Sequence, residues 1–138
     1  KKVVKFGGSS LASARQFKKV KAIIEADKTR CYVVPSAPGK RDSKDTKVTD
    51  MLYQCYDAAC AGESYKRILD QIKKRYTDII DGLDLNLNLD SNLRKLRELL
   101  KEAGRDYAAS RGEYLNGIIA ANYLGFTFVD AADVIRFD

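Results

Sequence analysis

Three short polar segments contain the residue types that could bind or transfer an anionic group. They are residues 5–10 (KFGGSS), 36–39 (SAPG) and 110–113 (SRGE). The first two follow apolar runs that are typical of strands, and the third precedes a helical pattern. Because ligands of open α/β sheets bind beyond the carboxyl ends of the strands, we expect at least the first two segments to lie at one edge of a sheet.

The segment 5–10 has the composition of an anion-binding loop. Lys5 supplies a cation, Gly7 and Gly8 let backbone N–H groups approach oxygens, and Ser9 adds a hydroxyl before a helix. The segment is neither a Walker A loop nor a GxGxxG loop. A tight strand-to-helix turn with a solvated lysine would contain the same residues, so both interpretations stay open.

The other two segments also have both a structural and a functional interpretation. Ser36 could hold a small polar substrate, or it could stabilise a Pro-x-x-Pro-Gly turn. Thr49 could bind substrate or cap the following helix. Glu113 follows Ser110 by three residues, which is the spacing of a capping box, and it could instead meet a substrate ammonium group. Arg111 could pair with Glu113 or with an anionic ligand.

The hydrophobic pattern predicts the elements that would position these residues. Strand-like runs occur at residues 2–6, 31–34 and 126–129. The second run is nearly continuous, which is typical of a central strand of a parallel sheet that is covered on both faces. A helix between the first two runs predicts a right-handed βαβ unit. The fold class is therefore α/β, with helices flanking a mainly parallel sheet.

The predicted helices follow the same logic. A helix begins at Ser13, with Gln16 as its capping-box partner. Other helices are predicted from about residue 49 and after residue 113. Two further helical patterns, at residues 64–80 and from residue 90, indicate an αα-hairpin inserted between the core units.

Composition excludes several classes of protein. No apolar run approaches the roughly 18 residues that cross a bilayer, and no signal peptide is visible, so we expect a cytoplasmic protein. The chain has three cysteines without CxxC spacing and no histidine, which argues against a disulfide framework and a metal site. The net charge of +6 is spread over several helices. It fits a solvated surface or attraction of nucleotide phosphates, and nucleic-acid binding is not expected.

Taken together, four segments resemble motifs of the aspartate kinases. KFGGSS at 5–10 resembles the opening signature K-F-G-G-[ST]-S, and VVPSAPG at 33–39 resembles V-V-x-S-A-x-G. KVTDML at 47–52 resembles [KG]-[VI]-T-[DN]-x-L, and SRGE at 110–113 resembles S-x-G-E. The segments occur in the family's order, and a long helical pair between the third and the fourth is also a family feature.

The resemblance implies a fold and a set of site residues. Residues 1–138 would form the N-terminal, amino-acid-binding part of a three-layer α/β/α sandwich of the amino-acid kinase (carbamate kinase-like) type. L-aspartate would be held by Ser36, Thr49 and Glu113, with Glu113 on its α-ammonium group. The resemblance also implies that Lys5 is the catalytic cation that neutralises the transferred phosphoryl group. The phosphate path would be lined by Lys5, Gly7, Gly8 and Ser9.

The implied reaction is phosphoryl transfer, with ATP and Mg²⁺, to the side-chain carboxylate of L-aspartate. The product would be 4-phospho-L-aspartate, in the first step of lysine, threonine and methionine biosynthesis. A carboxylate is already ionised at neutral pH and needs no general base, so catalysis would consist of positioning and charge stabilisation.

The family's nucleotide-binding half and regulatory domains are not found in this sequence. We therefore expect residues 1–138 to be inactive alone and the full-length protein to be a homo-oligomer. Two alternatives stay open. One is another amino-acid kinase of the same fold, and the other is a non-catalytic binding or assembly module.

Overall fold

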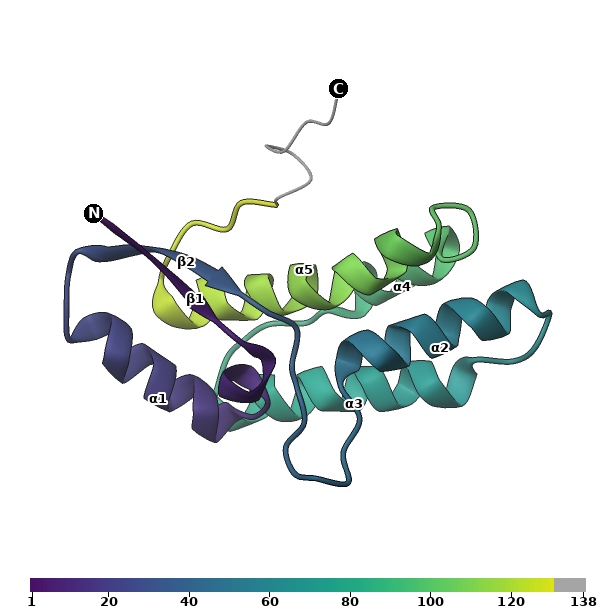
Figure 1. Ribbon diagram of the computed structural model, residues 1–138, viewed down its shortest axis with the longest axis horizontal. Coiled ribbons are helices and arrows are strands. Elements are labelled where there is room, and N and C mark those ends of the chain that lie inside the picture. Colours follow the sequence, from purple (N-terminus) through teal and green to yellow (C-terminus); the bar gives the residue numbers. More distant parts are fainter. Residues whose placement is uncertain (131–138) are drawn as a thin grey trace.

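The first two strands pair in parallel around one crossover helix. The computed structural model describes residues 1–130. β1 (Lys2–Phe6) is followed by the short 3₁₀ helix η1 (Gly8–Leu11), by α1 (Ala14–Glu25) and by β2 (Arg30–Pro35). β1 and β2 are parallel neighbours, as Figure 1 shows. The predicted α/β class and the predicted βαβ unit are therefore confirmed.

The remaining described elements are helices. They are α2 (Val48–Cys60), α3 (Lys66–Gly82), α4 (Asp90–Leu99) and α5 (Arg105–Leu124). The predicted helical pair corresponds to α3 and α4. Ser13 caps α1 as predicted, because its hydroxyl accepts a hydrogen bond from the Gln16 backbone N–H at 3.4 Å. Among residues 1–130, no helix combines the length and the apolar character that crossing a membrane requires.

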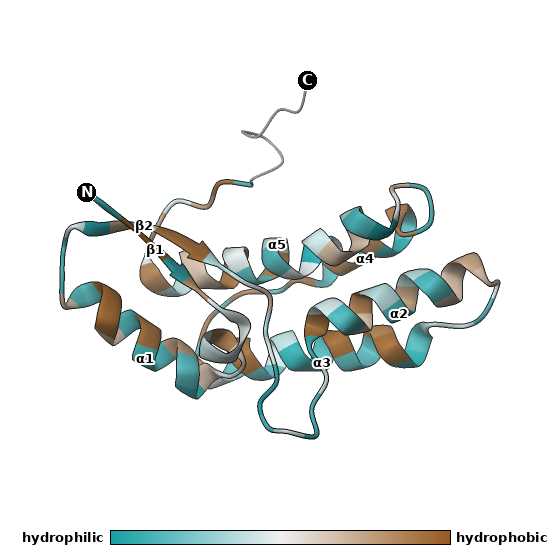
Figure 2. Ribbon diagram, viewed as in Figure 1, coloured by the Kyte–Doolittle hydropathy of each residue, from teal (hydrophilic) through white to brown (hydrophobic). Residues whose placement is uncertain are grey.

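The hydrophobic core lies between the helices and one face of the sheet. α3 packs against α1 and α2, and α2 packs against α5. Phe17, Leu52, Ile72, Tyr76 and Ile119 are at most 2% exposed. Figure 2 shows apolar and polar residues alternating along α1 and α3, as expected for helices that bury one side. This arrangement holds the loop after β2 against the start of α2 and against the middle of α3 and of α5.

The prediction that β2 is covered on both faces is wrong for the described residues. Val4 and Val33 pack toward the core, whereas Val3, Tyr32 and Val34 are 69%, 52% and 45% exposed. α1 and α5 contact β2. Successive side chains of a strand point to opposite faces, so the helices that cover Val33 leave the other face of the strand open.

The predicted third strand at 126–129 is also not formed. Residues 126–130 have no regular secondary structure. Phe128 packs edge-on against Tyr114, with ring centroids 5.5 Å apart, and a Cβ at Gly117 would lie only 2.8 Å from the Phe128 ring. Phe128 therefore packs on α5, whereas Phe126 and Val129 are 36% and 58% exposed. A strand also needs a neighbouring strand for its backbone hydrogen bonds.

Two helices begin before the residues that the sequence predicted. α5 begins at Arg105, after Gly104 with a φ of 97°, so Ser110 lies inside the helix. Its hydroxyl donates to the Tyr107 carbonyl at 2.7 Å. The capping-box interpretation of Ser110 is therefore wrong. α2 has Lys47 at its N-cap position, and Thr49 lies in the first turn and does not cap the helix.

The three cysteines provide a first test of the packing. Cys31 and Cys60 are exposed, whereas Cys55 is buried in the core at 1% exposure. Burial raises the pKa of the Cys55 thiol to about 11, which leaves almost no reactive thiolate at pH 8. We expect a thiol-specific disulfide reagent at pH 8 to modify two cysteines of the native chain rapidly and the third only after unfolding in urea. Three thiols that react equally fast in the native chain would contradict this packing.

Candidate functional site

A cavity of about 500 Å³ lies where the loops after β1 and β2 meet α2 and α5. Gly8 and Ser9 of η1 line one side. The loop after β2 contributes the stretch 36–40, and α2 contributes its N-cap Lys47 and Thr49. Glu113 of α5 completes the lining. All four segments that resemble aspartate kinase motifs therefore contribute to one cavity.

The two loops that follow the strands touch at glycines. The Ser36 N–H donates to the Phe6 carbonyl at 3.1 Å, which continues the pairing of the strands, and the Gly39 N–H donates to the Gly8 carbonyl at 2.9 Å. A Cβ at Gly39 would lie 2.6 Å from the carbonyl carbon of Gly8, and one at Gly8 would lie 3.0 Å from the Gly39 Cα. A side chain at position 39 would overlap the backbone of Gly8, and one at position 8 would be tightly crowded. This close crossing brings Ser9 and Ser36 to the same cavity.

The opposite wall is fixed by close contacts of α5 with α2 and with the loop after β2. A Cβ at Gly112 would lie 2.9 Å from the Ala37 Cβ and 3.2 Å from the Leu52 Cδ1. The absence of a side chain at Gly112 therefore lets α5 approach, and it brings the neighbouring Glu113 to the cavity. On the other side of the cavity, the Val48 N–H donates to the Pro38 carbonyl at 3.1 Å and joins α2 to the loop.

Asn116 fixes the end of β2 on α5, and the sequence analysis missed it. Its side-chain amide donates to the Ser36 carbonyl at 2.7 Å, and the residue is fully buried. It lies three residues after Glu113, on the same side of the helix. A polar residue among Leu115, Ile118 and Ile119 was the signal that could have identified it, because buried polar groups are normally paired.

The lining combines opposite charges. Lys40 and Lys47 are exposed cations, Glu113 is an exposed carboxylate, and the hydroxyls of Ser36 and Thr49 are half-buried between them. Such a surface can bind a molecule that has both an ammonium group and an acidic group. Hydrogen bonds to charged partners are the stronger ones, so the arrangement favours a zwitterionic ligand over an apolar one.

Tyr76 of α3 holds α5 in place next to the cavity-lining residue Glu113. Its hydroxyl donates to the Gly112 carbonyl at 2.8 Å in the protein interior. Burial raises the pKa of Tyr76, and the nearby Glu113 charge raises it further, while the Arg75 charge opposes the shift. The hydroxyl therefore stays protonated and keeps its hydrogen bond to α5.

Two of the predicted site residues do not line the cavity. The five that do are Gly8, Ser9, Ser36, Thr49 and Glu113. Lys5 is exposed on the open face of the sheet, where it lies opposite Val34 in the strand register. Gly7 lies outside the lining as well, and a Cβ there would meet no atom within 4 Å.

Arg111 does not pair with Glu113. Its guanidinium lies 3.7 Å from the Asp130 carboxylate and over the rings of Tyr107 and Tyr114, at 4.7 and 4.4 Å from their centroids. The predicted pairing with Glu113 is therefore wrong. The physical reason is that each residue of an α-helix turns the direction of the side chain by about 100°. Arg111 and Glu113 are two positions apart, so they point to nearly opposite sides of α5.

The fold and the cavity define an α/β protein with a polar ligand site beyond the carboxyl ends of parallel strands. No protein-family model matches the chain. The chain is 37% identical over 137 residues to Aspartokinase 3 of Bacillus subtilis (strain 168), across 94% of this chain and 30% of that protein. A crystal structure of Clostridium acetobutylicum aspartate kinase, described as an important allosteric enzyme, matches with a TM-score of 0.90 and 49% identity.

That structural match covers 94% of this chain and 30% of the other. The chain is therefore homologous to aspartate kinases, as the four motifs predicted. It spans about 30% of the length of the relatives that it matches.

The glycine crossing predicts an asymmetric response to two similar substitutions. Gly39→Ala should lower the free energy of unfolding by about 1–3 kcal/mol, because the new methyl group would overlap the backbone of Gly8 and Ser9. Gly7→Ala is the matched control, since a methyl group there meets open space at a φ of −74°. Urea unfolding of the chain measures both values. Equal values for the two variants would contradict the crossing.

Proposed function

We propose that the full-length gene product containing this chain is an aspartate kinase. It transfers the γ-phosphoryl group of ATP to the side-chain carboxylate of L-aspartate and forms 4-phospho-L-aspartate, the first step of lysine, threonine and methionine biosynthesis. The observation that carries the proposal is the single cavity to which all four motif segments contribute. Homology to aspartate kinases over 94% of the chain supports it independently.

The proposed binding of L-aspartate follows from the charges of the cavity. Glu113 binds the α-ammonium group, and the Ser36 and Thr49 hydroxyls donate hydrogen bonds to carboxylate oxygens. Lys40 and Lys47 make this end of the cavity positive, which favours a substrate with two carboxylates. The reacting carboxylate is already ionised at neutral pH, so positioning it is the main contribution of these residues.

The proposed phosphate path begins at the glycine crossing. Gly8 and Ser9 present backbone at the start of a short helix beside the cavity. Gly7 directly precedes them, and Lys5 lies two residues earlier, near the end of β1. Lys5 is the proposed catalytic cation that neutralises the phosphoryl group. These residues fit the triphosphate of ATP through backbone N–H groups and positive charge.

Mg²⁺ is expected to arrive with the nucleotide. Residues 1–130 contain no group of three or more side chains that could hold a metal ion. In phosphoryl-transfer enzymes Mg²⁺ is commonly bound by substrate phosphates and only one or two carboxylates. Its chemical contribution when bound would be neutralisation of phosphate charge.

We also propose that residues 1–138 are the N-terminal, aspartate-binding part of a three-layer amino-acid kinase sandwich. The exposed apolar face of the sheet, with Val3, Tyr32 and Val34, supports this, because a sheet face of this kind is normally covered. The nucleotide-binding half and the regulatory domains then belong to other parts of the gene product. A cytoplasmic location and assembly into homo-oligomers complete the proposal.

The role of Glu113 can be tested in the full-length gene product with a coupled kinase assay. Glu113→Gln should raise the KM for L-aspartate by at least about tenfold, because the ammonium group of the substrate would lose its charged partner. Glu25→Gln is the matched control, since Glu25 is an exposed residue near the end of α1. A KM for L-aspartate that is unchanged in Glu113→Gln, or turnover that does not depend on L-aspartate, would contradict the proposal.

A further inference from the structure

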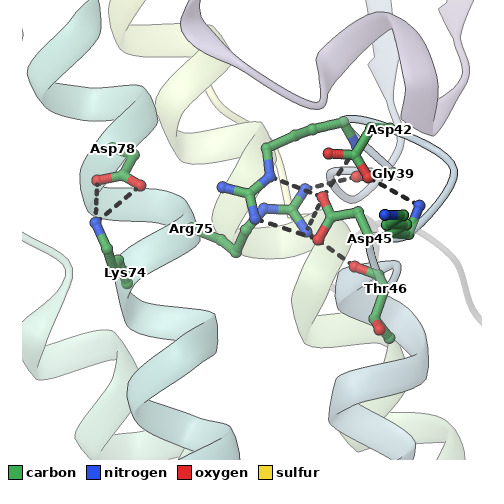
Figure 3. A network of polar contacts seen from close by, with 9 residues as sticks. Gly39, Asp42, Asp45, Thr46, Lys74, Arg75 and Asp78 are labelled. Atoms are coloured by element: carbon green, nitrogen blue, oxygen red, sulfur yellow. Dashed lines mark hydrogen bonds and ion pairs between the residues drawn. The ribbon is translucent and has the colours of Figure 1, made fainter.

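Arg75 connects the middle of α3 to the loop that precedes α2. We call residues 39–47 the site loop, because Gly39, Lys40 and Lys47 line the cavity. The Arg75 side chain is 4% exposed. Its Nη2 donates to the Gly39 carbonyl at 2.5 Å and its Nη1 donates to the Thr46 carbonyl at 2.9 Å, as Figure 3 shows. One guanidinium group therefore joins the beginning of the site loop to its end.

A carboxylate within the site loop strengthens this contact. The Arg75 Nη1 lies 3.3 Å from Asp45 Oδ2. Arg41 also binds Asp45, through its Nε at 2.7 Å, its Nη2 at 3.2 Å and its backbone N–H at 2.9 Å. These hydrogen bonds from Arg41 hold the pKa of the Asp45 carboxyl well below its usual range, and the Arg75 charge adds to the effect. Asp45 is thus an anion at neutral pH and pairs with both arginines; Figure 3 shows its contact with Arg75.

Packing alone does not explain a cation at this position. Transferring an arginine from water into the protein interior is costly, and an apolar side chain of similar size often stabilises a core at least as well. Ile72 and Tyr76, the buried neighbours of Arg75 on α3, are of the apolar and aromatic kind. An apolar residue at position 75 could not donate hydrogen bonds to two carbonyls of the site loop and pair with one of its carboxylates at once, whereas the planar guanidinium can.

We infer that Arg75 is a positioning residue that holds the site loop in the shape in which it can bind the amino-acid substrate. The Gly39 peptide links Arg75 to the cavity directly: its carbonyl accepts from Arg75, and its N–H donates to the Gly8 carbonyl at 2.9 Å. The other end of the loop leads from Thr46 into Lys47 and Thr49 at the cavity wall. The substrate part of this inference rests on the proposed function.

The kinetic test uses the full-length gene product and three variants. Arg75→Lys keeps the charge and loses the planar fork, Arg75→Met removes both, and Ile72→Ala loosens the same helix without changing a group that binds the site loop. Arg75→Lys should raise the KM for L-aspartate by about tenfold with little change in kcat, because the loop contributes equally to binding of substrate and transition state. Ile72→Ala should keep the wild-type KM.

Trypsin provides a second readout that does not depend on activity. The site loop contains four cleavage positions, after Lys40, Arg41, Lys44 and Lys47. Arg75→Lys should increase cleavage at these positions by about tenfold, as expected when a hydrogen-bonded anchor of a loop is lost. Cleavage after Arg97 in α4 should stay at the wild-type rate, whereas general destabilisation would accelerate it as well.

The outcomes separate this inference from the proposed function. Wild-type KM together with wild-type cleavage of the site loop in Arg75→Lys would overturn the inference. An equal increase of KM in Ile72→Ala would do the same, because it would assign the effect to lost stability. If the wild-type gene product shows no aspartate-dependent turnover, the proposed function fails, and the trypsin comparison alone decides whether Arg75 holds the loop. Should Arg75→Met not fold, Arg75→Lys decides.

Discussion

The peptide group of Gly39 is the point on which the site depends. Its N–H donates to the Gly8 carbonyl at 2.9 Å, and its carbonyl accepts from Arg75 at 2.5 Å. The loop after β1, the loop after β2 and helix α3 are thereby joined through one residue. No side chain fits there, since a Cβ at Gly39 would lie 2.6 Å from the Gly8 backbone. The parallel pairing of β1 and β2 brings the loops together, and this crossing sets their spacing.

The helices then place the remaining lining residues relative to the crossing. Gly112 lets α5 approach Ala37 to within contact distance, and Asn116 holds the Ser36 carbonyl at 2.7 Å. Glu113 lies between these two anchors on α5. Its carboxylate thus lines the cavity beside Ser36, because close packing at Gly112 and the Asn116 hydrogen bond fix α5 on both sides of it. A cavity built in this way has little freedom to change shape at its floor, which suits a reaction in which positioning is the main contribution.

Local patterns predicted the elements whose formation depends mainly on nearby residues. The βαβ unit, the Ser13 cap and the helical pair are of this kind, since apolar spacing and capping chemistry determine them. The prediction of a strand at 126–129 was wrong. An apolar pattern indicates that a segment is partly buried, but it does not indicate whether a neighbouring strand is present to share backbone hydrogen bonds. The capping box at Ser110 was wrong because the stretch 105–109 continues the helix back to Gly104.

The candidate site was predicted through its motifs, and its supports were not. Arg75 follows two lysines in the sequence, so it resembles part of a solvated basic run. Its spacing of three from Ile72 and four from Ile79 places it on the buried side of α3, and this was the available signal. The partners of Arg75 are backbone carbonyls 29 and 36 residues away. No local pattern in the sequence identifies such partners.

A crystal structure of the full-length gene product with L-aspartate tests the central claim most directly. We expect the α-ammonium group within hydrogen-bonding distance of the Glu113 carboxylate, and the ligand's carboxylates at the hydroxyls of Ser36 and Thr49. L-aspartate bound away from the cavity between the two strand loops and α5, or bound there with its ammonium group remote from Glu113, would contradict the assignment of this cavity as the amino-acid site.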